Sequence, residues 1–208
     1  VAHIGDSDLF SALDFSPPSI EAWANNWPTR AALALFRDAD DLLTTRSQAA
    51  ETLQPPRQEI LSAADRILRH HIQGWGDVSI QHGPTVDFNA DYGPSGKYGF
   101  HYWVWSRPLI QAFLITEDQK YLVEFDALFN SWYEQRDRVK GTFEFDVIYY
   151  ELGLGVRNGT FLEYYCLPFA ARPRQTHERM LKTLLGAGRW LFDEESRGYR
   201  GGNWQIMG

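Results

Sequence analysis

Residues 116–133 read TEDQKYLVEFDALFNSWY, and this stretch decides the fold class. Its apolar side chains recur at spacings of one, three and four residues, which gives one continuous face over several helical turns. These side chains are Tyr121, Leu122, Phe125, Leu128, Phe129, Trp132 and Tyr133. Thr116 and Gln119 have the spacing of a capping box, so the pattern predicts a helix that begins after Thr116 and ends at the polar turn 137–141.

Similar periodicity lies on both sides of this segment. Further helical segments are predicted at several places: short pieces before residue 56, 60–72, a segment from Phe100 in which Pro108 either opens a fresh helix after Ser106 or kinks a continuous one, 147–169, a helix capped by Thr176, and a helix start at 203–207. Successive helices with few strand-like alternations predict an all-α protein whose neighbours pack as antiparallel hairpins. No repeat of about 34 residues emerges, which favours an irregular α/α solenoid or toroid over a tetratricopeptide array.

Residues 74–99 interrupt the helical pattern. They read GWGDVSIQHGPTVDFNADYGPSGKYG, which is rich in turn-forming residues and too irregular for a helix or a regular strand. Trp75, Phe88, Tyr92 and Tyr98 lie within this segment. Because such aromatic side chains favour burial over disorder, we expect a long loop packed over another element.

Composition limits the classes of partner. The 208 residues carry a net charge of -7 and no run of Lys or Arg, which argues against a nucleic-acid partner. Eight Trp, ten Tyr and 13 Phe supply one sizeable core, and we treat 1–208 as a single helical domain. Arg side chains could still bind the carboxylate or sulfate of an acidic sugar.

Motifs of metal and cofactor chemistry do not emerge. The histidines lack H-E-x-x-H spacing, the single Cys166 forms no thiolate site, and Gly153 and Gly155 lack the context of a phosphate loop. We therefore expect no metal and no cofactor. Carboxylates such as Glu144 and Glu151 leave open a glycoside hydrolase with two carboxylates, because their separation cannot be read from the sequence.

Three segments, in their order and spacing, carry a family resemblance. They are HYWVWSR at 101–107, which the capped helix follows, ELGLGVR at 151–157 and GGNWQ at 201–205. Together they resemble the N-terminal helical domain of heparinase II/III-like polysaccharide lyases, and LFSALD at 9–14 is similar to that family's start. The resemblance spans nearly the whole chain, although each motif is short.

The resemblance implies an incomplete α/α toroid that binds an acidic polysaccharide and cleaves it by β-elimination next to a uronic acid. Removal of the C5 proton requires the adjacent carboxylate to be neutralised, and the family places an amide for this purpose at Asn203. Substrate contacts are expected from the same motifs: Arg157, Trp204, Gln205, Trp105 and His101.

Each of these residues also has a structural interpretation. Asn203 could equally cap the helix that follows Gly201 and Gly202. For Arg157, a structural ion pair with Glu151 or Glu163 is the default expectation. Trp103 is a further candidate for sugar stacking, but core packing is favoured for it.

In the family, the acid and base and then a β-sandwich follow the Asn turn, whereas this chain ends five residues beyond Asn203. We therefore expect a fragment that is truncated before the sandwich and has no lyase activity alone. The resemblance implies a periplasmic or secreted location, and we separately expect no membrane partner. The alternative function is a non-catalytic helical module that binds a carbohydrate or a protein.

Overall fold

The computed structural model describes residues 4, 8, 56–141, 146–165, 167 and 173–196. The elements in chain order are α4 (Arg57–Ile67), β1 (His71–Gln73), β2 (Ser79–Gln81), α5 (Pro94–Phe100), η1 (Val104–Ser106), α6 (Arg107–Thr116), α7 (Lys120–Gln135), η2 (Arg136–Arg138), α8 (Glu151–Tyr165) and α9 (Arg174–Ser196). The helical pieces expected before residue 56 and at 203–207 lie outside the described residues.

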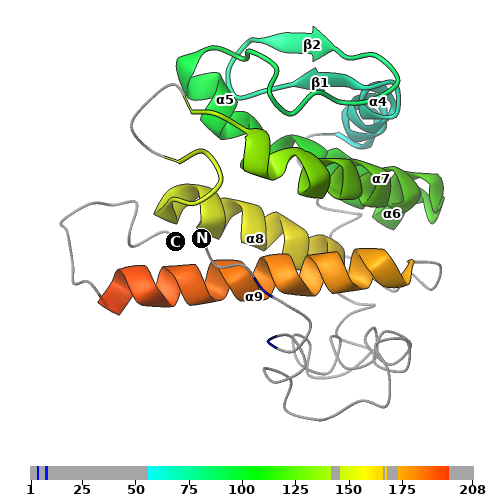
Figure 1. Ribbon diagram of the computed structural model, residues 1–208. Helices are drawn as coiled ribbons and strands as arrows, with labels where there is room; N and C mark the ends of the chain where they lie inside the picture. The colour runs from blue at the N-terminus through cyan, green and yellow to red at the C-terminus, as the bar shows by residue number, and fades with distance from the viewer. Residues whose placement is uncertain are drawn as a thin grey trace.

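The helices lie in layers (Figure 1). α6 and α7 form a helical hairpin, α4 packs on α6, and α8 and α9 form the next pair of neighbours below them. The small β1–β2 hairpin lies beside α4, at the opposite end of the molecule from α9. The predicted all-α class is confirmed for the described part of the chain, with this two-stranded sheet as its only β-structure.

The helix that decided the fold class forms as predicted, but its start differs. The predicted apolar face of α7 is buried from Tyr121 to Trp132. The expected capping box is wrong, because α7 begins at Lys120 and its N-cap has no side-chain hydrogen bond. Thr116 instead ends α6, where its hydroxyl donates to the Ala112 carbonyl at 2.7 Å, and the Asp118 carboxylate accepts from the Lys120 N–H.

Over residues 68–81 the structure differs from the prediction, which was a helix over 60–72 followed by a loop. α4 ends at Ile67, and His70 has a φ of 55°, a left-handed conformation that stops the helix. The chain then pairs antiparallel, with Ile72 opposite Ile80. Ile72 is fully buried, as its apolar spacing predicted, but it lies in a strand and not in the helix. Phe88, Tyr92 and Tyr98 are buried as expected.

The two last helices also begin at other residues than predicted. α8 begins at Glu151, after a turn in which the Asp146 carboxylate accepts hydrogen bonds from the Ile148 and Tyr149 N–H groups. α9 begins at Arg174, directly after Pro173, so Thr176 lies inside its first turn. Of the two alternatives for Pro108, the structure shows the fresh helix after Ser106.

An aromatic cluster centred on Trp103 forms the core. Trp103 is fully buried, and its ring centroid lies 5.1–5.9 Å from those of five rings: Phe88, Trp105, Phe125, Trp132 and Phe161. The core interpretation of Trp103 is confirmed. Its φ of 64° is costly for a bulky side chain, and packing on every side of the indole holds it there.

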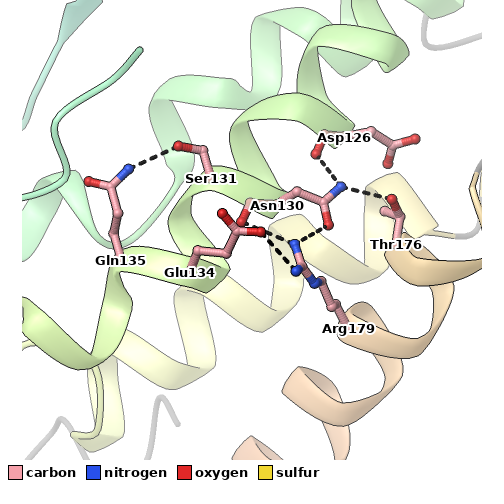
Figure 2. A network of polar contacts seen from close by, with 7 residues as sticks. All are labelled: Asp126, Asn130, Ser131, Glu134, Gln135, Thr176 and Arg179. Carbon is pink, nitrogen blue, oxygen red and sulfur yellow. Dashed lines mark hydrogen bonds and ion pairs between the residues drawn. The ribbon is translucent and has the colours of Figure 1, made fainter.

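A polar seam joins α7 to α9 (Figure 2). The Asn130 amide donates to the Thr176 hydroxyl at 2.8 Å, and its oxygen accepts from Arg179 at 3.0 Å. Arg179 also pairs with Glu134 at 2.8 Å, close to the surface. Asn130 on α7 thus binds two side chains of α9, whereas Glu134 contributes only an exposed charge.

We predict that Asn130→Ala lowers the free energy of unfolding by about 1–3 kcal/mol, because it removes hydrogen-bond partners of the Thr176 and Arg179 side chains on α9. Urea denaturation followed by circular dichroism measures this loss. Glu134→Gln is the matched control and should cost less than about 1 kcal/mol, since Glu134 is 63% exposed. Equal losses in the two variants would contradict the assigned role of Asn130.

Candidate functional site

The predicted site residues divide into three groups. Asn203, Trp204 and Gln205 lie outside the described residues. Arg157 and His101 lie in the core, in contact with each other. Trp105 lines a surface pocket.

Arg157 is held by backbone carbonyls from two segments. It is 1% exposed, and its guanidinium donates to the His101 carbonyl at 2.9 Å and to the Ile148 carbonyl at 2.5 Å. Burial lowers its pKa to about 10, which still leaves it charged at neutral pH. The expected ion pair with Glu151 or Glu163 is wrong, because the guanidinium binds these two carbonyls and Glu163 pairs with Arg107 at 2.7 Å. This placement does not fit direct contact with a polysaccharide.

His101 has both ring nitrogens occupied. Its Nδ1 accepts from the Trp132 indole N–H at 3.2 Å, and its Nε2 donates to the Phe88 carbonyl at 3.0 Å, which sets a neutral tautomer. Burial, followed by the nearby Arg157 charge, lowers its pKa to about 3. The expected substrate contact of His101 does not fit this position, and we assign it to the core.

Trp105 and Trp75 form the aromatic part of a pocket of about 260 Å³. Trp105 is partly buried, and its indole N–H donates to the Phe100 carbonyl at 2.8 Å. Trp75 is 59% exposed and meets Tyr102 edge to face at 5.6 Å. The pocket therefore joins one anchored indole to one that is accessible to a ligand.

Close packing on α5 sets the position of Trp75. A Cβ atom built on Gly99 would lie 2.0 Å from the Trp75 Cβ, so only glycine permits this approach. The sequence predicted that Trp75 would be packed against another element, and it did not predict that the side chain would be largely exposed. The Gly-Trp-Gly context at 74–76 was the available signal, since it marks a tight turn that can present a side chain outward.

Polar groups from α4 and β1 complete the pocket. Arg66 and Gln73 are exposed, and His71 is partly buried with its Nε2 2.8 Å from the Ser79 hydroxyl. Aromatic faces with a few polar groups, one of them an arginine, are suited to a sugar ring that carries an acidic substituent. The volume lies just below the roughly 300–1,000 Å³ of typical small-molecule sites, which suits one ring.

The described ranges hold no group of three His, Cys, Asp or Glu side chains placed to bind a metal ion. Within the same ranges, no helix combines the length and hydropathy of a transmembrane segment.

No protein-family model matches the sequence, and no curated protein matches it. The fold is nevertheless that of a helical portion of polysaccharide lyases. Heparan sulfate lyase HepC from Pedobacter heparinus matches with a TM-score of 0.57 and 16% identity, over 86% of this chain and 31% of that one. A heparinase III matches with a TM-score of 0.59 and 14% identity, over 99% of this chain and 35% of that one.

The chain thus spans about a third of the length of the lyases that it resembles. At this level of identity the likeness concerns the fold. It confirms the helical architecture expected from the three motifs, an incomplete α/α toroid.

We predict that His101 makes the protein less stable in acid. Its folded pKa of about 3 lies below the value of about 6.5 in an unfolded chain. Between these values the unfolded chain binds a proton that the folded chain does not, so stability falls as pH falls. The contribution is roughly 2 kcal/mol between pH 7 and pH 5.

Urea unfolding at both pH values measures this term. His101→Gln should lose less stability than the wild type on acidification, whereas the control His71→Gln should keep the wild-type difference. A wild-type difference retained in His101→Gln would contradict the assignment.

Proposed function

We propose that this chain is part of a polysaccharide lyase that cleaves a uronate-containing polysaccharide by β-elimination. The observation that carries the proposal is the likeness in fold to heparan sulfate lyase HepC and a heparinase III, which extends over 86% and 99% of the chain. The order of the 101–107, 151–157 and 201–205 motifs in the sequence also supports it.

We assign the neutralising amide to Asn203. The C5 proton of a uronate is weakly acidic, and its removal places negative charge on the adjacent carboxylate. A hydrogen-bond donor held against that carboxylate stabilises the enolate-like intermediate. A base then accepts the C5 proton and an acid protonates the leaving oxygen at C4. The family resemblance assigns these two roles to residues that follow the Asn turn. Trp204 and Gln205 are proposed to contact the same sugar.

We assign a further sugar contact to the pocket of Trp75 and Trp105. The exposed Trp75 indole can stack on the apolar face of a pyranose, while Arg66 can pair with a carboxylate or sulfate. The protein as a whole is acidic, so this local arginine, rather than long-range attraction, would hold the anionic substrate.

Asn203→Ala in the full-length gene product should lower kcat by about 30- to 1,000-fold, equivalent to roughly 2–4 kcal/mol of transition-state stabilisation. The assay follows the ultraviolet absorbance of unsaturated uronate released from heparan sulfate, alginate and chondroitin. Asn89→Ala, at an exposed asparagine in the 82–93 loop, is the matched control and should leave kcat unchanged. An unchanged rate in Asn203→Ala would reassign Asn203 to helix capping. Binding of a polysaccharide without any turnover by the wild type would favour a non-catalytic module.

Trp75→Ala should raise KM by roughly two- to tenfold with little change in kcat, because an aromatic contact outside the reacting centre contributes about 0.5–1.5 kcal/mol of binding. Phe192→Ala removes an exposed aromatic ring from α9, since Phe192 is 76% exposed against 59% for Trp75, and should not change KM. Identical KM values for Trp75→Ala and the wild type would remove the pocket from the proposed substrate path.

A further inference from the structure

His70 forms the corner between α4 and the β1–β2 hairpin. α4 ends at Ile67, and β1 begins at His71, directly after His70. The φ of 55° at His70 turns the chain, and this left-handed conformation has an energetic cost in a residue other than glycine. Contacts made by His70 itself must therefore hold the corner in place.

The hydrogen bonds of His70 reach three segments. Its N–H donates to the Ile67 carbonyl at 2.8 Å, and its carbonyl accepts from the His82 N–H at 2.9 Å. In the imidazole ring, Nδ1 lies 2.8 Å from the Gly83 carbonyl oxygen. Nε2 lies 3.1 Å from Oε1 of Glu124, on α7. The ring thus ties the corner both to the loop after β2 and to α7.

The two ring contacts together need one proton more than a neutral histidine and an ionised glutamate carry. The Gly83 carbonyl only accepts, so Nδ1 of His70 must donate to it. If Nε2 then carries no proton and Glu124 is ionised, two lone pairs face each other at 3.1 Å. A hydrogen bond forms only when a proton lies between Nε2 and Oε1, whichever of the two atoms carries it. The contact is therefore a hydrogen bond at low pH, and it is lost as the pH rises.

The surroundings of the pair strengthen this dependence on a proton. The side chains of His70 and Glu124 are 20% and 19% exposed, so water screens their interaction less than it would at the surface. Burial raises the pKa of the Glu124 carboxyl, an effect that the adjacent His70 opposes. Loss of the shared proton would leave this carboxylate charged, partly buried and deprived of its hydrogen bond to His70.

His82, in the loop after β2, is a second titratable group close to His70. Burial lowers the pKa of His82, although the charge of Asp87 opposes this effect, so His82 is largely neutral at neutral pH. The remaining charged groups on the neighbouring elements are exposed or already bound: Asp65, Arg66 and Arg69 at the end of α4, Lys120 on α7 and Asp87 in the loop. Among the described residues, Glu124 is thus the acidic group that contacts His70.

His70 lies between two walls of the Trp75 pocket. α4, before it, contributes Arg66 to the lining, and β1, after it, contributes His71 and Gln73. Trp75 follows in the turn of the same hairpin. While the corner is held, these side chains keep their positions relative to one another. When the corner opens, β1 can move away from α4 and the pocket loses its shape.

We propose that His70 and Glu124 are positioning residues whose shared proton holds β1 in place, so that the Trp75 pocket binds an acidic sugar more tightly below neutral pH than above it. The part of this inference that concerns the sugar rests on the proposed function. Because the proton belongs to the closed corner, closure is complete at low pH and weakens as the pH rises. Binding of the sugar should accordingly be coupled to the uptake of a proton.

Hydrogen exchange in the full-length gene product tests the position of β1 without any sugar. The amides of Gly74 and His82 donate across the hairpin, to the Val78 and His70 carbonyls, and report its opening. Their protection factors should be roughly three- to tenfold higher at about pH 6 than at about pH 8, the range in which histidine changes charge. A protection factor already corrects for the intrinsic effect of pH on exchange.

Glu124→Gln is the variant that isolates the shared proton. Its amide N–H can donate to an unprotonated Nε2 of His70, so the contact no longer needs the extra proton. The variant should keep the hairpin protected at both pH values and lose the wild-type difference. Glu134→Gln makes the same replacement on the same helix, at a side chain that is 63% exposed, and should retain the difference. His101 is present in all three proteins, so its own effect in acid is common to them.

Isothermal titration calorimetry with oligosaccharides of heparan sulfate, alginate and chondroitin tests the coupling to the pocket. The Kd of the wild type should rise roughly three- to tenfold from the lower to the higher pH, whereas that of Glu124→Gln should change less. His71 lines the pocket in both proteins, so any charge of its own cancels in the comparison. If none of the three sugars binds, the proposed function is contradicted, and hydrogen exchange still decides the role of the pair.

Equal protection of the wild-type hairpin at the two pH values would overturn the proposal, as would a Glu124→Gln variant that keeps the wild-type dependence. The same change of Kd in both proteins would overturn the coupling of the pair to the pocket. If Glu124→Gln does not fold, NMR of the His70 ring nitrogens in the wild type gives the answer. Nδ1 should stay protonated over the whole range while Nε2 loses its hydrogen bond, and an Nε2 signal that does not shift would contradict the shared proton.

Discussion

The hydrogen bonds of the buried Arg157 guanidinium are the interaction on which the described structure depends most. They join the His101 carbonyl, after α5, to the Ile148 carbonyl, before α8. His101 extends the connection to Trp132 on α7 and to the Phe88 carbonyl. Two polar side chains therefore connect α8 with four other segments: the loop at Phe88, the end of α5, α7 and the 146–150 segment. Their removal from water is tolerated because nearly every polar atom finds a partner.

This polar chain supports the aromatic cluster, and the cluster supports the pocket. Trp132 packs on Trp103, Trp103 stacks on Trp105, and Trp105 forms the anchored wall of the candidate sugar site. Trp75, at the open side, is positioned separately by its contact with Gly99. The site thus combines a wall held by the core with an accessible ring on a turn, an arrangement suited to a flat, partly apolar ligand.

Sequence reasoning could predict the helices with a strong 3.6-residue period, because burial of one face dominates their formation. Sequence reasoning failed where contacts between distant segments determine the secondary structure or the exposure of a residue. Ile72 continues the apolar spacing of α4 but pairs with Ile80 in a strand. His101 and Arg157, read as substrate contacts from their motifs, are core residues, because a motif reports similarity and not exposure. The Gly-Trp-Gly turn at 74–76 was a local signal for the exposure of Trp75, but its approach to Gly99 depends on the tertiary fold, which no local pattern specifies.

The proposal that connects these features to chemistry is that an amide at Asn203 neutralises the carboxylate of a bound uronate. The most direct measurement is a crystal structure of the full-length gene product with a uronate-containing oligosaccharide, in an inactive variant that retains Asn203. The proposal predicts the Asn203 Nδ2 within about 3.2 Å of a uronate carboxylate oxygen. An Asn203 side chain turned into a helix N-terminus, with the sugar bound elsewhere, would contradict it.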